Sequence, residues 1–216
     1  MNDPRRHPDV PYPLPLPPLR EIPERKGPLM VPIVYEPVGR DPVRRLYERR
    51  RVLLGVPLDA AAATDISAEL MSLDGGSGEA IELLINSPGG PLEDVFAVLD
   101  VIHLARATVD VTCFGRALGT AAVVLACGTG TRRATPNASI SLRCDPVPTT
   151  VGSAAEVERQ VRRDRDLRER VRSMLVERTG LPAHRVDHEL DEGATLDAAA
   201  VRELGIIDEI VTRPTT

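Results

Sequence analysis

The segment AIELLINSPGGPLEDVFAVLDVI, residues 80–102, decides the fold class of this chain. Residues 80–86 form a short apolar run of strand length, and SPGG at residues 87–90 ends that run with turn-forming residues. Behind Pro91, a residue type favoured where a helix begins, apolar side chains recur at helical spacing at Leu92, Val95, Phe96, Leu99 and Ile102. The segment therefore predicts a strand, a tight turn and a helix in direct succession.

The same alternation continues on both sides of this segment. Strands are predicted at residues 51–56, 109–114, 139–142 and 206–211, and helices at residues 60–73, 118–127 and 197–204. Strands that alternate with helices are typical of a parallel sheet, because a parallel connection needs a crossover. We therefore expect an α/β fold built from repeated βαβ units.

Residues 154–178 are predicted to form the longest helix. Apolar side chains at Val157, Val161, Leu167, Val171 and Leu175 form one stripe among many Arg and Glu residues, and Gly180 follows as a stop signal. Such a helix either projects and packs against another copy of the chain, or lies across its own domain. The sequence leaves both interpretations open.

Composition excludes several classes of partner. The 216 residues suffice for one ordinary globular core, and the formal net charge of −5 gives no overall attraction to nucleic acid or to an anionic membrane. Aromatic residues make up only 2%, so stacking platforms for bases are scarce. No run approaches the ~18 apolar residues of a membrane-spanning helix, and no secretory signal is visible. We expect a cytoplasmic protein without nucleic-acid or membrane partners.

Cysteine and proline usage adds two expectations. Cys113, Cys127 and Cys144 are odd in number and widely spaced, which predicts reduced thiols rather than a disulfide framework or a metal site. We expect neither a metal nor a cofactor. Dense prolines over residues 1–42 exclude a helix or a central strand there and indicate an arm or leader.

The INSPGG turn at residues 85–90 and the small-residue stretch CFGRALGTAAVVLACG at residues 113–128 resemble the proteolytic subunit of bacterial Clp protease, a serine peptidase of the crotonase-like fold. Weaker similarities at MVPIV (30–34), Pro136-Asn137, Thr179-Gly180 and GIIDEI (205–210) extend the resemblance over roughly residues 29–212. It implies a disordered leader at residues 1–28 and one family domain at residues 29–216. It also implies that helix 154–178 is a handle joining two heptameric rings into a chamber, which an AAA+ ATPase feeds with unfolded chains.

The catalytic positions implied by the resemblance are degenerate. The serine of the family falls on Gly119, its histidine falls on Arg143, and its aspartate falls on Glu189. Arginine stays protonated at physiological pH and cannot accept a serine proton. We therefore expect the peptidase activity of this chain to be lost, because the members of a triad act as a unit.

The peptide-binding backbone is expected to survive at Gly89, Gly90 and Thr120, which fall on the oxyanion-hole and peptide-binding positions of the family. Charge complementarity further suggests an ion pair between Arg143 and Glu189 across the inactive site.

Other candidate residues have simpler interpretations. The hydroxyls of Thr120 and Ser141 lack a nearby histidine and favour structural roles. His184 and His188 are four residues apart on a predicted helix, which imitates a metal pair but is more typical of solvated histidines. Cys144 adjoins the cation of Arg143, which lowers a thiol pKa, although filling the end of a strand is the simpler role.

The resemblance also bears on ATPase docking. In the family, the strand before INSPGG carries aromatic residues that line the apolar pocket for the ATPase loop, whereas here that strand offers Glu82 and Leu84. A carboxylate in an apolar pocket is unfavourable unless it is paired. We expect weak or absent docking of an AAA+ ATPase on this subunit.

These observations favour a structural or regulatory subunit of a Clp protease chamber, in rings formed with itself or with a triad-complete paralogue. Two alternatives remain open. One is an active serine-type endopeptidase with a noncanonical site, and the other is a crotonase-type acyl-CoA enzyme that uses the same backbone donors.

Overall fold

Strand β3 (Val109–Leu118) is the centre of the sheet, because three other strands pair with it. In this computed structural model, residues 42–75, 78–144 and 153–211 are described, and all of them belong to the unit that spans residues 39–216. The elements before β3 are α1 (Pro42–Tyr47), β1 (Arg51–Leu54), α2 (Ala60–Asp74), β2 (Ile81–Ser87) and α3 (Val95–Leu104). Those after it are α4 (Thr120–Ala126), β4 (Arg132–Ala134), β5 (Ser139–Ser141), α5 (Ala154–Thr179), α6 (Ala183–Glu192), α7 (Ala198–Glu203) and β6 (Glu209–Ile210).

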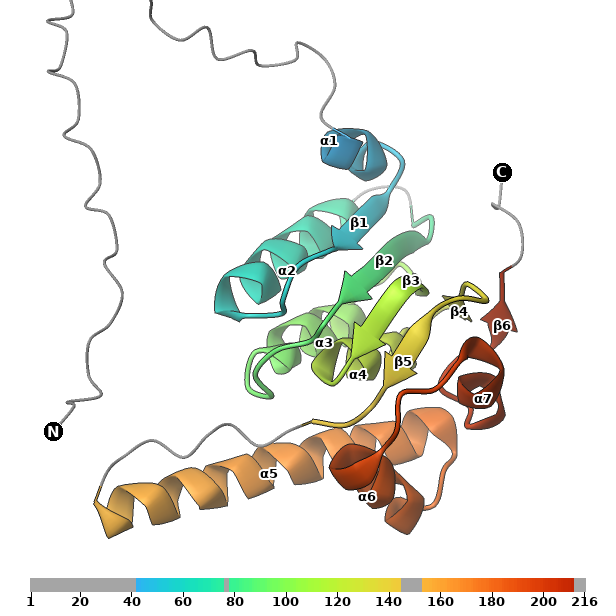
Figure 1. The fold of residues 1–216 in the computed structure, drawn as a ribbon. Coiled ribbons are helices and arrows are strands. Elements are labelled where there is room, and N and C mark those ends of the chain that lie inside the picture. The colour runs from blue at the N-terminus through green and yellow to red at the C-terminus, as the bar shows by residue number, and fades with distance from the viewer. Residues whose placement is uncertain (1–41, 76–77, 145–152, 212–216) are drawn as a thin grey trace, which may run out of the picture. The chain divides into compact units, whose positions relative to one another are not determined.

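All pairings between these strands are parallel, which confirms the predicted α/β class (Figure 1). The order in the sheet is β1-β2-β3-β4-β6, and β5 pairs with the far end of β3. On the side away from β2, the first half of β3 pairs with β4 and its last three residues pair with β5. The carboxyl ends of β2, β3 and β5 therefore meet at one edge of the sheet, where ligands bind in open α/β folds.

One face of the sheet is buried and the other is partly open. Buried and half-buried residues alternate strictly along β2, as expected when only one face of a strand packs against a core. Helices α2, α3 and α4 cover the buried face (Figure 1). On the other face Arg51, Glu82 and Leu84 remain half-exposed.

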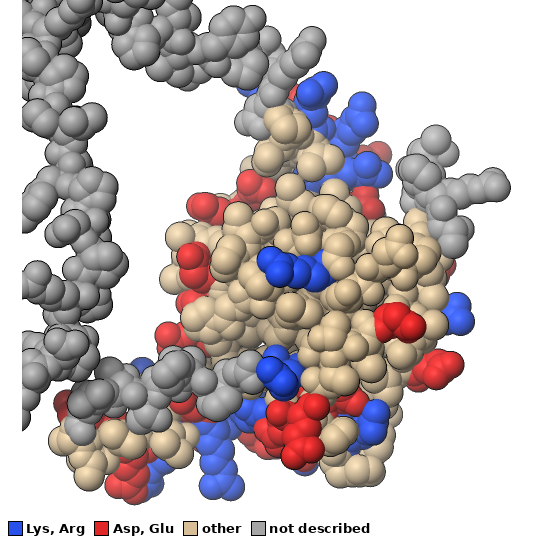
Figure 2. All heavy atoms as spheres, viewed as in Figure 1, with Lys and Arg blue, Asp and Glu red and all other residues tan. Residues whose placement is uncertain are grey.

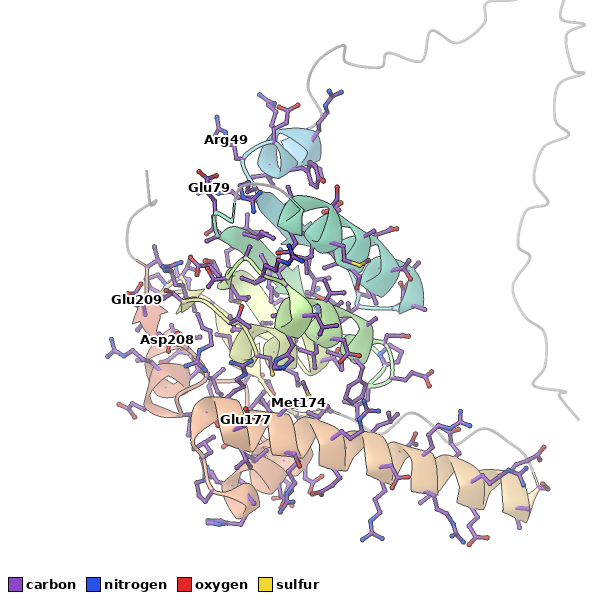
Figure 3. All side chains as sticks on the ribbon, turned by 180° about the vertical axis from the view of Figure 1, so that it is seen from behind. Arg49, Glu79, Met174, Glu177, Asp208 and Glu209 are labelled. Carbon is purple, nitrogen blue, oxygen red and sulfur yellow. The ribbon has the colours of Figure 1, made fainter. Side chains whose placement is uncertain are left out.

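Charged side chains order the edge of the sheet beyond β3. Arg132 pairs with Asp208 at 2.5 Å, and Arg133 pairs with both Asp110 and Glu209 at 3.1 Å. Figure 3 shows Asp208 and Glu209 next to each other beside β6. These ion pairs join the C-terminal strand to β3 and β4.

The long helix α5 begins with a capping box formed by Ser153 and Glu156 and ends at Gly180, which has left-handed backbone geometry. Its C-terminal half packs on its own domain through the fully buried Val171 and Leu175, whereas Val161 in its N-terminal half is 56% exposed. Figure 1 shows the N-terminal half extending past the sheet. The C-terminal half of the helix therefore lies across its own domain, and packing of the N-terminal half against another copy stays a prediction.

Some boundaries differ from those predicted. The helix predicted at residues 118–127 begins at Thr120, because β3 continues to Leu118 in order to pair with β5. Strand β4 was not predicted, because its sequence Arg-Arg-Ala carries no apolar run. Among the described helices, none combines the length and the apolar character that crossing a bilayer requires. The predicted leader, residues 1–28, lies outside the described residues.

Candidate functional site

The turn after β2 is held against the end of β3 by close backbone contacts. Gly89 has a φ of +79°, and a Cβ on it would lie 2.2 Å from the carbonyl oxygen of Leu118. A Cβ on Gly90 would lie 2.0 Å from the carbonyl oxygen of Leu58. The buried Ser87 hydroxyl donates to the Val56 carbonyl at 2.6 Å and accepts the Gly89 N–H at 3.1 Å. Both glycines are therefore required sterically, and Ser87 has a structural role.

Gly119 lies where β3 passes into α4, and it has φ +55° and ψ −122°, a conformation that side chains rarely adopt. Its N–H donates to the Ser141 carbonyl at 2.8 Å, which joins it to the end of β5. A Cβ on Gly119 would lie 3.3 Å from the Arg143 carbonyl oxygen and 4.0 Å from the Cys144 sulfur. The backbone thus aims this position toward the end of β5, but no side chain is present to react.

The N–H of Gly90 is already engaged. It donates to the Thr120 hydroxyl oxygen at 2.8 Å, and the hydroxyl lies 3.3 Å from the Gly90 carbonyl, to which it donates. The Thr120 side chain is buried, with only 1% of the residue exposed. The hydroxyl therefore already accepts the hydrogen bond of the N–H that was expected to bind a carbonyl oxygen. Its own proton is donated to the Gly90 carbonyl, which favours a structural role over a nucleophilic one.

The structure brings two of the three positions expected to correspond to a triad into one pocket. Gly119 and Arg143 both line a pocket of about 730 Å³ at the carboxyl edge of the sheet. Gly90, Thr120, Ser141 and Cys144 also line it. The Ser141 hydroxyl donates to the Gly193 carbonyl at 3.4 Å and accepts the Arg143 N–H at 3.3 Å, so it is tied into the wall of the pocket.

Glu189 lies behind the wall of this pocket. It is 4% exposed, and its Oε1 pairs with Arg185 of the same helix at 2.8 Å. Its other oxygen would lie 2.9 Å from a Cβ on Gly193, and Gly193 lines the pocket. Within the described residues the expected ion pair between Arg143 and Glu189 is not formed, because Glu189 is paired locally on α6.

Helix α5 contributes charged residues to the pocket that the sequence analysis did not identify. Asp164, Arg165 and Arg168 line the pocket. Arg168 donates to the carbonyls of Cys144 at 3.2 Å and Leu190 at 2.8 Å and pairs with the Asp191 carboxylate, so it ties α5 to β5 and α6. The signal in the sequence was the i, i+3 spacing of the two arginines, but it is not distinguishable from a solvated helix face.

The histidines of α6 and the three cysteines lie in different environments. His188 lies 3.8 Å from Glu192 of its own helix, and His184 is exposed. No group of three His, Cys, Asp or Glu that could hold a metal ion occurs in the described part of the chain. Burial raises the pKa of the Cys113 thiol to about 12 and that of Cys127 to about 11, whereas Cys144 is only half-buried and lines the pocket.

Glu82 on the open face of the sheet is paired. Its Oε2 lies 2.7 Å from Nε of Arg51 on the neighbouring strand, and its Oε1 accepts the Thr112 hydroxyl at 3.2 Å. These partners offset the unfavourable burial of its carboxylate. Arg51, Glu82 and Thr112, from three neighbouring strands, therefore form a polar row at the position where the sequence predicts a carboxylate in place of an apolar docking pocket.

Comparison with known proteins agrees with this geometry. The family model described as Clp protease matches residues 36–214. The chain is 32% identical over 173 residues to the ATP-dependent Clp protease proteolytic subunit 1 of Thermobifida fusca, covering 79% of this chain and 78% of that protein. It is 37% identical over 177 residues to a putative ATP-dependent Clp protease proteolytic subunit-like protein of Streptomyces coelicolor, covering 79% and 82%. A proteolytic subunit 1 of Tropheryma whipplei is 35% identical over 174 residues, covering 79% and 84%.

Proposed function

The chain belongs to the Clp protease family, and on that premise we propose that it is a subunit of a Clp protease chamber that has lost its own peptidase activity. Its role is then structural and regulatory. The observation that carries the proposal is Gly119, which has the backbone of a reactive turn, points toward the end of β5 and has no side chain to attack a peptide.

The other groups of the pocket do not replace the missing chemistry. Arg143 cannot serve as a general base, because its guanidinium stays protonated. The Thr120 and Ser141 hydroxyls are engaged with the backbone of Gly90 and Gly193. The alternative of an active peptidase would require another nucleophile in this pocket, and the half-buried Cys144 has no histidine among the residues that line it.

We further propose that the exposed N-terminal half of α5 forms the contact between rings, either with a second copy of this chain or with a triad-complete paralogue. Val161 offers the apolar contact, and closed symmetry would bury it. The polar row of Arg51, Glu82 and Thr112 supports weak docking of an AAA+ ATPase on this subunit. Heptameric rings and a cytoplasmic location belong to the same proposal.

Hydrolysis of a small fluorogenic peptide tests the proposal. The purified chain is assayed alone and after co-assembly with a triad-complete paralogue, and the paralogue alone serves as the control. We expect no turnover by the chain alone and a changed rate or thermal stability of the mixed assembly. Turnover by the chain alone would establish the peptidase alternative, turnover of an acyl-CoA would establish the crotonase alternative, and failure to assemble with itself or with the paralogue would contradict the chamber role.

A further inference from the structure

The lining of the pocket that contains Gly119 is slightly basic, although the chain has a negative net charge. Three arginines line it, Arg143 from the end of β5 and Arg165 and Arg168 from α5, against two carboxylates, Asp164 and Glu192. The chain as a whole carries a formal charge of −5. Three arginines against two carboxylates give the lining a formal charge of +1, opposite in sign to the charge of the chain, which is compatible with an anionic ligand.

The two carboxylates and one of the arginines have local partners. Asp164 accepts the Gln160 side-chain amide at 2.8 Å, and Glu192 lies 3.8 Å from His188. Arg168 is held by Asp191 and two backbone carbonyls. The Arg165 side chain, by contrast, forms no hydrogen bond or ion pair with another described residue, and it is exposed. One guanidinium at the pocket is therefore available to a ligand.

The rest of the lining fits a peptide. Pro88, Pro91, Leu92 and Leu118 form an apolar wall beside the arginines, and Gly119 leaves the floor without a side chain. The volume of about 730 Å³ is within the usual range for sites that hold a small ligand. Figure 2 shows acidic and basic side chains gathered over α5 and α6, whereas the sheet region above them is largely uncharged.

We propose that this pocket binds the carboxylate of a peptide, with Arg165 as the ligand-contacting cation and Arg143 as a second cation in the lining of the pocket. Planar guanidinium groups bind carboxylates through paired, charge-assisted hydrogen bonds, which distinguishes this ligand from an uncharged peptide segment. The inference rests on the proposed function, because a chain that does not cleave holds such a peptide rather than consuming it. A C-terminal carboxylate and an acidic side chain share this chemistry.

Fluorescence anisotropy with the full-length assembled protein tests the proposal. The probes are fluorescein-Ala-Ala-Ala-Leu with a free carboxylate, the same peptide as its C-terminal amide, and an amide with Glu in place of the last Ala. We expect the free acid to bind about tenfold more tightly than the simple amide, a difference of about 1.4 kcal/mol. If the Glu-containing amide binds more tightly than the free acid, the site is assigned to acidic side chains. If the free acid binds more tightly than the Glu-containing amide, the site is assigned to chain termini.

Arg165→Gln should abolish the preference for the acid, and Arg143→Gln should reduce it. Arg162→Gln is the matched control, because Arg162 lies on the same helix, pairs with Glu158 and does not line the pocket. Equal affinity for all three probes, no binding of any probe, or an unchanged preference for the carboxylate-containing probe in Arg165→Gln would overturn the proposal. Assembly and binding are measured separately, so an assembled chain that binds no peptide refutes this inference alone, and a chain that binds peptide without assembling refutes the chamber role alone.

Discussion

Restoring Ser, His and Asp at the three expected triad positions should not by itself restore peptidase activity. The Gly90 N–H already donates its hydrogen bond to the Thr120 hydroxyl and is not available to a substrate carbonyl. The perturbation has two steps. First, Gly119→Ser, Arg143→His and Glu189→Asp are combined in one chain. Then Thr120→Ala is added, which removes the hydroxyl of this side chain, 1% exposed, and leaves no γ atom in front of the Gly90 N–H.

The structure sets the expected magnitude of each step. The Gly90 N–H donates to the Thr120 hydroxyl at 2.8 Å, so a substrate carbonyl must displace that hydroxyl to reach the donor. Loss of one oxyanion donor lowers kcat about 10²- to 10³-fold. We therefore expect Thr120→Ala to raise kcat of the triple variant about 100-fold. A serine at position 119 would have its Cβ 3.3 Å from the Arg143 carbonyl oxygen, which requires a shift of the neighbouring backbone by a few tenths of an ångström.

The assay is hydrolysis of a small fluorogenic peptide by the assembled protein, with thermal unfolding followed by circular dichroism to show that each variant is folded. Thr120→Ser in the triple variant is the matched control, because it shortens the side chain but keeps the hydroxyl, and it should leave the rate low. Equal rates for the triple variant with and without Thr120→Ala would refute the reasoning. A fast triple variant with Thr120 intact would show that the hydroxyl moves aside without cost.

Three further predictions follow from the contacts of the fold. Gly89→Ala should lower the free energy of unfolding, measured in urea titrations, by at least about 2 kcal/mol. Its Cβ would lie 2.2 Å from the Leu118 carbonyl oxygen, at a residue with a φ of +79°. Gly75→Ala is the control and should have little effect, because no atom lies within 4 Å of its Cβ position. Arg132 lowers the pKa of Asp208, so the ion pair stabilises the folded state fully above the ordinary carboxyl pKa of about 4. That stabilisation is lost as the pH falls through the lowered pKa. Asp208→Asn should therefore lower the free energy of unfolding at pH 7 by about 1 kcal/mol or less, and the difference from the unchanged protein should vanish in acid. Of the 3 thiols, only that of Cys144 should react with Ellman's reagent in the native protein, because burial raises the pKa of the Cys113 thiol to about 12 and that of Cys127 to about 11; reaction of either buried thiol before unfolding would contradict this.

The fold was predictable from local pattern, because each βα step carries its own signal. The apolar run before INSPGG and the helical spacing behind it predicted β2 and α3, although α3 begins at Val95 rather than directly behind Pro91. Strand β4 carried no such signal, since its two arginines are held by the carboxylates of Asp110, Asp208 and Glu209. Partners that distant in the chain cannot be assigned from the sequence of β4 alone.

The side-chain partners at the site were not predictable in the same way. That Gly119 and Arg143 share a pocket followed from the family resemblance, but the hydrogen bond from Gly90 to Thr120 and the ion pair of Glu82 with Arg51 depend on the register of neighbouring strands and on side-chain rotamers. The ion pair expected between Arg143 and Glu189 failed for a local reason. Arg185 lies one turn from Glu189 on α6 and pairs with it at 2.8 Å.

The INSPGG turn can persist without catalysis because the fold itself needs it. Gly89 and Gly90 are required where the turn passes within contact of the Leu118 and Leu58 carbonyls, and Ser87 fastens the turn to Val56. Each of these contacts packs the chain, and none of them requires a nucleophile. Positions 119 and 143 are those at which a catalytic side chain is expected. The backbone N–H groups of both residues donate hydrogen bonds to Ser141, and these bonds do not involve the side chain at either position. The contacts that hold the turn are therefore independent of the side chains at positions 119 and 143.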